Sequence, residues 1–562
     1  MRRLSTVAPA VAALALASAA PLAGAAKQPR SSQPARPVVL GAGPTAEPSD
    51  RPGDGFRRVT FSPDGDGRDD VVAVRVRAPK GTRLRLHVRL ASGATLLTVT
   101  GSRTAARVSR VTWDGRAPGG RRLPDGSYVL RVCSATTHRC AATRVLVHLR
   151  LVTVYTPEAQ GVSAGQTVRV HVATDRAGPY TLDLVSASSP TGRGLGAQAV
   201  AQPGWLEYRV PDVPAGGLWL LRVRSGSFAA RFPLVVHEPA LPLDDPPHGT
   251  ALVVYPYITW RAYNRYDENR DGRIDSWYAH PRDPVVPLFG PFEMGRPEIS
   301  LAGREAHASG QRAFAGWVQA HHLSPQAVTD VELGRLPLSL LRRYATIVFE
   351  GHTEYYEPRT YARLLRYRDG GGRLYFFQGN SFYGAVRIGG GKIVRLSYRY
   401  RTAARSDFKL AADGFRSCCW PASIRPVYHL LPGVTEELPW LFEGTGLKAG
   451  DAFGVAMGEV DTVDPQLSPR GTIRIASATV PRFTPTLKAV AWLGTRPFPY
   501  EPSSVRPRRI DIAYAAAGRG EVFSWGNTGF AETIRSPGAG LPRRERAALD
   551  RVALNVWRWF TR

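Results

Sequence analysis

The chain has 562 residues, a formal net charge of +28, 43% hydrophobic residues and 21% charged residues. This is the composition of an ordinary globular protein, and the length predicts three or four domains, so wholesale disorder is excluded. The positive charge comes mainly from arginine spread along the chain, which favours either solvated cations or a basic face for an anionic envelope polymer or membrane surface. Nucleic acid is not expected as a partner, because no recognition motif accompanies the charge.

The amino terminus has the pattern of an export signal. Arg2 and Arg3 precede an apolar stretch over 7–20, and residues 23–25 (AGA) offer small side chains to signal peptidase. We expect a signal peptide over 1–25 and a mature chain that is secreted or at the cell surface. No later segment reaches the roughly 18 apolar residues typical of a membrane-spanning helix. Residues 26–55, rich in Pro, Ala and Ser, are expected to be a linker.

Two β-sandwiches are expected next. Residues 56–150 alternate apolar and polar positions between turn signals, which predicts an immunoglobulin-like sandwich, and residues 151–238 predict a second one. The segment 61–70 (FSPDGDGRDD) and the tripeptide 113–115 (WDG) resemble the immunoglobulin-like module of flagellar hook-capping proteins. That resemblance implies a spacer or adhesion module without chemistry of its own.

The four cysteines fall into two pairs. Cys133 and Cys140 flank a short turn between two strand-like runs, so we expect a disulfide across that hairpin in an exported chain. Cys418 and Cys419 are adjacent and either form a vicinal disulfide or remain thiols. A zinc site is not expected, because no matching set of Cys and His residues accompanies them.

From residue 239 the pattern changes to continuous apolar runs separated by amphipathic segments. Runs at 252–255, 345–349, 374–377 and 521–525 suit strands buried on both faces, and segments such as 358–369 predict helices between them. This alternation predicts a doubly wound α/β domain over 239–562. In such sheets ligands bind at the carboxyl ends of the strands, so we expect the functional site at that edge.

Several short motifs occur in a fixed order in this carboxyl-terminal part. They are residues 258–264 (ITWRAYN), 350–356 (EGHTEYY), 377–383 (FQGNSFY), 458–461 (GEVD) and 518–523 (GRGEVF). They resemble the C-terminal domain of the N,N-dimethylformamidase large subunit and its relatives, a likeness that covers residues 155–562. The resemblance implies a domain like the class I glutamine amidotransferases. In the amidase relatives it also implies a mononuclear iron held by tyrosines and a glutamate.

Four residues of these motifs are candidate catalytic groups. Tyr263 follows the first apolar strand and Glu354 follows the 345–349 strand, and the resemblance implies both as iron ligands. His352 is a candidate base or orienting residue, and Asn380 follows a further strand. The second tyrosine ligand stays open among four residues near these motifs: Tyr255, Tyr257, Tyr355 and Tyr356. The alternative for each candidate is a structural one: a core aromatic, a buried ion pair or a turn residue.

A second candidate metal site lies in residues 267–275 (DENRDGRID), which follow the spacing of an EF-hand calcium loop. Tyr278 stands where the loop usually has its bidentate glutamate, so a remote acid or a water would have to complete the calcium shell. The alternative is a solvated polar turn. The oxygen ligands expected here are those of Asp267, Asn269, Asp271, the Arg273 carbonyl and Asp275.

Three interpretations of function remain open. The first is an exported hydrolase-like protein that acts on C–N amide or related bonds at a metal site. The second is a non-catalytic surface protein that binds a small molecule or an envelope polymer such as a glycan, with the sandwiches as spacers. The third is a structural envelope component. Serine-hydrolase and nucleotide chemistry are disfavoured, because the G-x-S-x-G, H-E-x-x-H and P-loop motifs are absent from the sequence.

Overall fold

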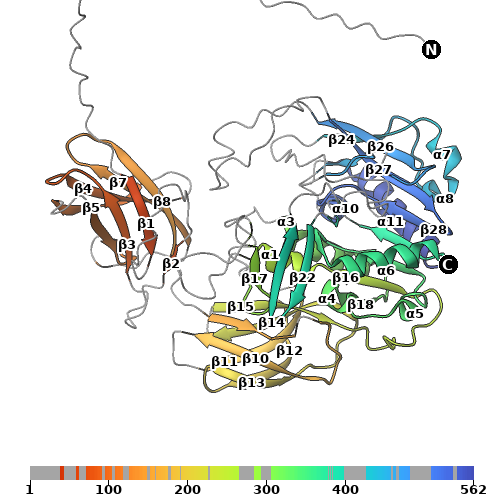
Figure 1. The fold of residues 1–562 in the computed structure, drawn as a ribbon, viewed down its shortest axis with the longest axis horizontal. Coiled ribbons are helices and arrows are strands. Elements are labelled where there is room, and N and C mark those ends of the chain that lie inside the picture. Colours follow the sequence, from red (N-terminus) through yellow and green to blue (C-terminus); the bar gives the residue numbers. More distant parts are fainter. Residues whose placement is uncertain are drawn as a thin grey trace, which may run out of the picture.

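In the residues that it describes, the computed structural model has six β-sheets, and strands outnumber helices (Figure 1). It describes residues 38–43, 59–61, 71–90, 95–103, 108–117, 120, 126–147, 152–158, 160–174, 179–189, 192–225, 228–264, 277, 284–292, 306–377, 379, 381–382, 384–397, 426–456, 460–463, 468–480, 508–535 and 541–562. The expected signal peptide lies outside this set. Within it, no helix combines the length and the apolar character that crossing a membrane requires.

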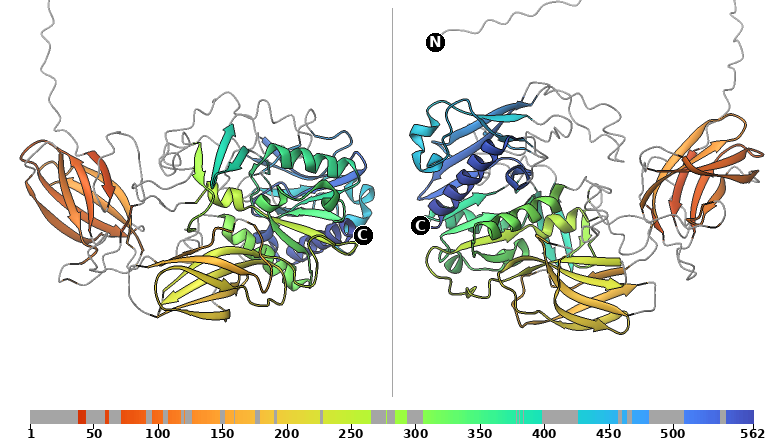
Figure 2. Two further views of the ribbon diagram at one scale, coloured as in Figure 1. Left: turned by 60° about the horizontal axis from the view of Figure 1, so that its bottom comes forward. Right: turned by 180° about the vertical axis from the view of Figure 1, so that it is seen from behind.

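The first sandwich consists of two sheets, and Figures 1 and 2 show it as a separate unit beside the rest. One sheet has the order β1 (Val38–Gly43), β3 (Val72–Arg77), β6 (Val108–Trp113). The other has the order β2 (Val59–Phe61), β8 (Cys140–Val147), β7 (Gly126–Ser134), β4 (Arg83–Leu90), β5 (Thr95–Arg103). Alternate residues of β3 and β4 face the core between the sheets. Strand β1 lies inside the segment we expected to be a linker, so the sandwich begins earlier in the chain than its pattern indicated.

The predicted disulfide is confirmed. Cys133 on β7 and Cys140 on β8 are paired directly across the hairpin, and their Cα atoms are 4.0 Å apart. The two cysteines are seven positions apart in the sequence, so the bridge closes the turn between β7 and β8.

The second sandwich also has two antiparallel sheets. The three-stranded sheet is ordered β13 (Gly204–Arg209), β10 (Thr167–Thr174), β9 (Val152–Tyr155). The four-stranded sheet is ordered β12 (Leu195–Val200), β11 (Tyr180–Ser186), β14 (Gly217–Ser225), β15 (Phe228–Val236). This sandwich contacts the carboxyl-terminal part through Glu332, whose carboxylate is 3.0 Å from His237 Nε2 and accepts a hydrogen bond from the Gly161 amide.

A nine-stranded sheet forms the centre of the carboxyl-terminal part. Its first five strands are parallel: β18 (Gln326–Thr329), β16 (Ala251–Tyr255), β19 (Thr346–Phe349), β21 (Arg373–Phe376), β28 (Gly520–Ser524). Four antiparallel strands continue it: β27 (Arg508–Ala517), β26 (Ile473–Val480), β24 (Val427–Leu430), β25 (Ala452–Val455). A separate four-stranded sheet has the order β17 (Val285–Pro287), β23 (Lys392–Ser397), β22 (Gly384–Gly389), β20 (Tyr355–Tyr356).

Residues of the parallel strands contribute to cores on both faces of the sheet. Ala251 and Val253 of β16 join one core with α3 (Ala306–Ala320), α10 (Phe530–Arg535) and α11 (Arg543–Phe560). The intervening Leu252 and Val254 join the other core with α5 (Leu338–Leu341) and α6 (Pro358–Asp369). This burial explains the continuous apolar runs. The remaining helices are short: α1 (Tyr257–Ala262), α4 (Asp330–Leu333), α7 (Val434–Glu437) and α8 (Pro439–Phe442).

The prediction of a doubly wound α/β domain, like that of the glutamine amidotransferases, is wrong. The large sheet is mixed, and strands make up 41% of the structure against 21% for helices. Apolar runs indicate that a strand is buried, but they do not give its direction, and strands β24 to β27 escaped the sequence pattern. The immunoglobulin-like amino-terminal region is supported.

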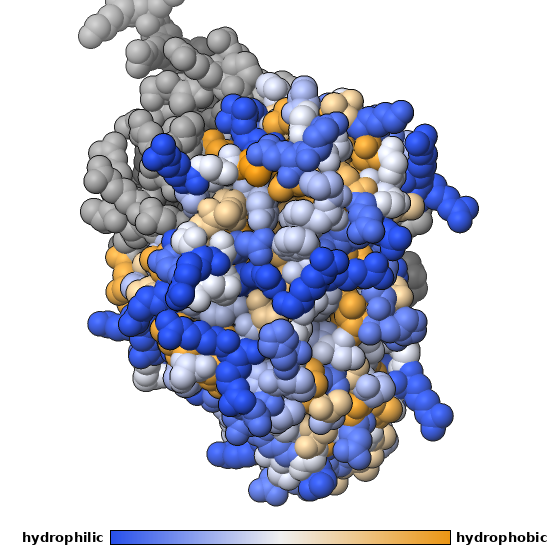
Figure 3. Space-filling model, turned by 90° about the vertical axis from the view of Figure 1, so that its right-hand side faces the viewer, coloured by the Kyte–Doolittle hydropathy of each residue, from blue (hydrophilic) through white to orange (hydrophobic). Residues whose placement is uncertain are grey.

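One face of the molecule is mainly hydrophilic. Figure 3 shows one face on which hydrophilic side chains predominate and hydrophobic residues are scattered among them. Scattered apolar residues of this kind need no functional explanation. A functional site is therefore better sought in the polar groups at the ends of the strands.

Candidate functional site

Two segments distant in sequence emerge at one edge of the large sheet. Helix α1 follows β16 directly and ends at Ala262, with Tyr263 as its C-cap, and the segment before β20 follows β19 and contains Glu354. Strands β16 and β19 are neighbours and parallel, with Val254 opposite Phe349. Their carboxyl ends therefore deliver both segments to the same place.

Side chains of neighbouring elements position helix α1. The Ile258 amide at its first turn donates hydrogen bonds to both carboxylate oxygens of Asp330, at 3.1 and 3.3 Å. Burial raises the pKa of Asp330 well above its ordinary value, against the opposing effect of these backbone donors. In the middle of the helix, the Thr259 hydroxyl accepts hydrogen bonds from the Glu354 amide at 3.0 Å and the Tyr355 amide at 3.3 Å. Asp330 thus holds one end of α1, and Thr259 ties α1 to the segment after β19.

Three oxygen-bearing side chains converge at the end of α1. The Tyr263 hydroxyl donates a hydrogen bond to Oε2 of Glu354, and it lies 3.1 Å from the Tyr355 hydroxyl. Nε2 of His352 lies 3.3 Å from the same Glu354 oxygen. All four side chains are buried, with Tyr263 the most exposed at 8%. The structure therefore brings three predicted site residues together and adds Tyr355, one of the four tyrosines left open by the sequence.

The Tyr355 ring is held on several sides. Its centroid lies 4.7 Å from that of Trp277, whose amide donates a hydrogen bond to the Ala262 carbonyl at the end of α1. On another side, a Cβ added to Gly384 would come within 2.5 Å of the Tyr355 ring. The Gly384 amide also donates a hydrogen bond to the Glu354 carbonyl at 2.8 Å. Glycine at 384 therefore allows the β22 backbone to approach the site closely.

Gln311 of α3 is a polar residue near the site that sequence analysis missed. It is 1% exposed, and neither atom of its side-chain amide has a hydrogen-bond partner within the described part of the chain. A Cβ added to Gly351 would lie 2.4 Å from Gln311 Nε2, so the amide packs against the backbone next to His352. Gly351 has φ +78, which also favours glycine. A buried amide without a partner normally costs free energy, which makes Gln311 a candidate ligand-binding group.

The converging set suits a metal ion by its chemistry. Two phenols and one carboxylate are hard oxygen donors, and hard cations prefer oxygen ligands. The residues that could hold such an ion are Tyr263, Glu354 and Tyr355, with His352 beside the carboxylate. Within the described residues, no three His, Cys, Asp or Glu side chains lie together as a group that could hold a metal, and this set is instead rich in tyrosine.

The other predicted site residues cannot be placed. Asn380 and the five expected calcium ligands lie outside the described residues, as do Cys418 and Cys419. The five are Asp267, Asn269, Asp271, Arg273 and Asp275.

Two solved structures resemble this chain over a third of its length or less. PorZ, a bacterial surface component of the type-IX secretion system of Porphyromonas gingivalis, matches with a TM-score of 0.11 and 20% identity, over 15% of this chain and 10% of its own. The BSP domain of a biofilm associated protein matches with a TM-score of 0.13 and 14% identity, over 33% of this chain and 29% of its own. No curated protein matches the sequence.

Family models match two separate parts of the chain. Residues 62–138 match the FlgD Ig-like domain, which agrees with the first sandwich. Residues 197–541 match the model described as "N,N-dimethylformamidase beta subunit-like, C-terminal". This second match spans more than half of the chain and includes the Tyr263–Glu354–Tyr355 site. The chain belongs to the N,N-dimethylformamidase beta subunit-like, C-terminal domain family.

Proposed function

We propose that this protein is an exported, hydrolase-like enzyme that acts on an amide or related C–N bond at a metal ion held by Tyr263, Glu354 and Tyr355. The observation that carries the proposal is the convergence of two phenol oxygens and one carboxylate oxygen at the end of α1. Family membership supports the hydrolase-like class. Iron is the metal that the resemblance implies, and the donor set is compatible with it.

The residues around the three oxygens have distinct roles in this proposal. When bound, a metal ion would polarise a substrate carbonyl and lower the pKa of a bound water. His352 is placed to take up or hold a proton at Nε2, because that atom lies 3.3 Å from Glu354 Oε2. Gln311 offers both a donor and an acceptor in a buried position, which suits the binding of an amide group. Thr259 and Asp330 act indirectly by positioning α1.

Metal content is the measurement that tests the proposal. Wild-type protein purified from the secreted fraction is expected to carry metal near one equivalent. Tyr263→Phe, Tyr355→Phe and Glu354→Ala should each lose most of it, and with it turnover on a panel of amides. Tyr356→Phe is the matched control, because Tyr356 is the neighbouring buried tyrosine and packs instead against Tyr361 and Phe382. Equal metal content in all four variants, with unchanged near-ultraviolet circular dichroism, would reject the site.

A second candidate function is binding of a glycan at the cell surface without catalysis. It is favoured by a row of three rings on adjacent strands of the second sandwich, formed by Tyr155, His171 and Trp205. Trp205 is 48% exposed, and the guanidinium carbon of Arg169 lies 4.7 Å from its ring centroid. In this case Trp205→Ala would lower retention in affinity electrophoresis through a neutral polysaccharide, and the purified protein would contain no metal at the Tyr263 site.

A further inference from the structure

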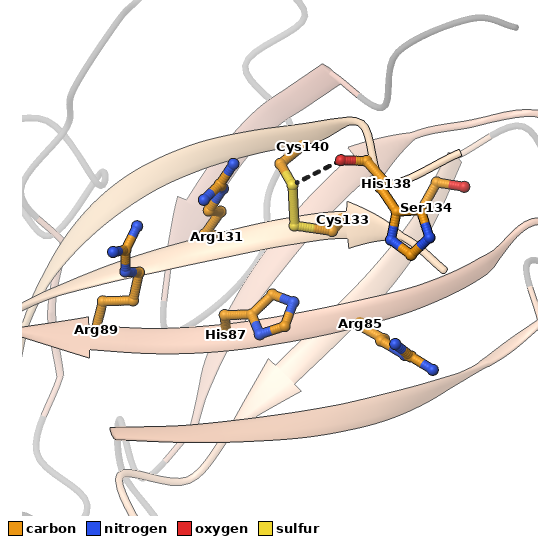
Figure 4. Close-up of a pocket in the computed structure, with 8 residues that line it drawn as sticks. All are labelled: Arg85, His87, Arg89, Arg131, Cys133, Ser134, His138 and Cys140. Atoms are coloured by element: carbon orange, nitrogen blue, oxygen red, sulfur yellow. Dashed lines mark hydrogen bonds between the residues drawn. A yellow bond between two sulfur atoms is a disulfide. The ribbon is translucent and has the colours of Figure 1, made fainter. Parts of the chain in front are cut away.

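The outer face of the five-stranded sheet in the first sandwich carries a row of cations. Along β4, the apolar residues Leu84, Leu86 and Val88 face the core, so the alternating Arg85, His87 and Arg89 face outward. Figure 4 shows these three side chains in sequence along one strand. Cations at alternate positions of a strand are spaced by about 7 Å.

The neighbouring strand completes a hollow around these cations. Arg131 of β7 lies directly opposite His87, and Cys133 of β7 lies opposite Arg85. The hollow has a volume of about 300 Å³, at the lower end of the range for small-ligand pockets. Its lining includes the three arginines, His87, His138 from the β7–β8 turn and the disulfide (Figure 4). The disulfide closes the turn that presents His138.

The strands around this hollow supply no carboxylate to balance its cations. Strands β4, β5, β7 and β8 contain no aspartate or glutamate. Neither Arg85 nor Arg131 has a carboxylate within ion-pair distance in the described part of the chain. Some arginines elsewhere do have carboxylate partners: Arg222 lies 2.7 Å from Asp183, and Arg373 lies 2.7 Å from Glu521. Within the described residues, Arg85 and Arg131 are therefore two cations beside one hollow that have no carboxylate partner.

The arginines of this cluster act electrostatically on His87. Burial lowers the pKa of His87 from its ordinary value, and the positive charges of Arg131, Arg85 and Arg89 lower it further. The ring is held by a 2.8 Å hydrogen bond between Nδ1 and the Thr98 hydroxyl. Facing like charges destabilise a sheet, and a bound anion would remove that cost.

We propose that this hollow binds a sulfate or phosphate group between Arg85 and Arg131. The group is part of an extended anionic polymer, which stays intact. Guanidinium groups recognise tetrahedral oxyanions with paired hydrogen bonds, which a lysine ammonium cannot form. His87 and His138 provide further N–H donors at the wall of the hollow. The row of cations along β4 suits a linear polymer, because successive anionic groups can contact successive cations.

Isothermal titration calorimetry of the full chain tests the proposal, with dextran sulfate as the polymer, sodium sulfate as the free ion and neutral dextran as the blank. At constant ionic strength, Arg85→Gln combined with Arg131→Gln should weaken dextran sulfate binding at least about tenfold. The matched control combines Arg75→Gln with Arg77→Gln, which removes the same charge from the outer face of the opposite sheet. That control should change affinity less than about threefold. Equal losses in the two variants would overturn the proposal, because binding would then follow net charge alone.

The free ion and pH provide two independent arms. Sodium sulfate should displace dextran sulfate from the wild type, whereas no displacement would show that the hollow does not recognise the sulfate group. Sulfate keeps its charge between pH 5 and 8, so affinity should rise as the pH falls and His87 becomes protonated among Arg85, Arg89, Arg131 and His138. His87→Gln should flatten this dependence. A wild-type affinity that is constant over this range would contradict the placement of His87 at the bound anion.

Discussion

The most informative perturbation of the catalytic region is Thr259→Val, which keeps the shape of a buried side chain and removes one oxygen. That oxygen accepts hydrogen bonds from the amides of Glu354 and Tyr355, and Thr259 is 1% exposed. The variant therefore removes the acceptor that these two buried N–H donors share. Each buried N–H group that loses its acceptor costs about 1–3 kcal/mol, so the segment after β19 should lose about 2–6 kcal/mol of local stability.

Hydrogen exchange followed by mass spectrometry measures this loss where it occurs. A peptide that contains Glu354 and Tyr355 should exchange at least about thirtyfold faster in the variant, since each 1.4 kcal/mol corresponds to a factor of ten. Peptides from the two sandwiches should exchange as in the wild type. Local exchange is preferable to a global unfolding curve, because a chain with several sandwiches and sheets does not unfold in one step.

Thr360→Val supplies the matched control. Thr360 on α6 is also buried, but its hydroxyl oxygen has no hydrogen-bond partner within the described residues. The same substitution there removes an unsatisfied polar atom and should leave exchange unchanged or slower. If Thr259→Val and Thr360→Val gave the same exchange at residues 354 and 355, the role of Thr259 as the tie between α1 and the site would be refuted.

Two further predictions concern the disulfide and the buried acid. Replacing both Cys133 and Cys140 by serine should destabilise the first sandwich by about 2 kcal/mol, because the unfolded chain then regains the entropy that the closed short loop removes. The calorimetric transition of this sandwich should fall by roughly 10 °C, while the other transitions stay where they are. A thermogram identical to that of the wild type would contradict this prediction. Asp330 has a folded-state pKa above its unfolded value of about 3.9, so its contribution to stability is greatest at low pH and is lost as the pH rises toward the folded pKa. Asp330→Asn keeps an oxygen acceptor for the Ile258 amide and should therefore gain in urea stability relative to the wild type between pH 4 and pH 7, whereas a relative loss over that range would refute the assignment.

Part of the architecture could be predicted from local patterns. Alternation of apolar and polar residues correctly indicated strands in the first sandwich, and the spacing of Cys133 and Cys140 indicated their bridge. Continuous apolar runs indicated the parallel strands β16, β19, β21 and β28. The mixed character of the large sheet was missed, because the direction of a strand depends on connections and long-range pairing that leave no local period.

Part of the candidate site could also be predicted. Tyr263 and Glu354 were singled out because each follows a strand within a recognisable motif, and the structure brings their side chains into hydrogen-bond contact. Tyr355 could not be separated from its neighbour Tyr356, since both are buried aromatic residues in sequence terms. On the short strand β20 adjacent residues point to opposite sides, so that Tyr355 contacts Tyr263 while Tyr356 packs against Phe382.

The amino-acid sequence by itself determined that β16, β19, β21 and β28 are buried strands, that Cys133 pairs with Cys140, and which motifs supply a phenol and a carboxylate. Only the tertiary structure decided that β16 and β19 are neighbours and that cations of β4 and β7 share one hollow. It also decided that Asp330 binds the Ile258 amide of α1 across 72 residues, and that Thr259 of α1 binds the Glu354 amide across 95 residues. The physical reason is that local patterns reflect burial and turn geometry, which depend on nearby residues. Sheet order and the meeting of distant side chains depend instead on how the cores pack.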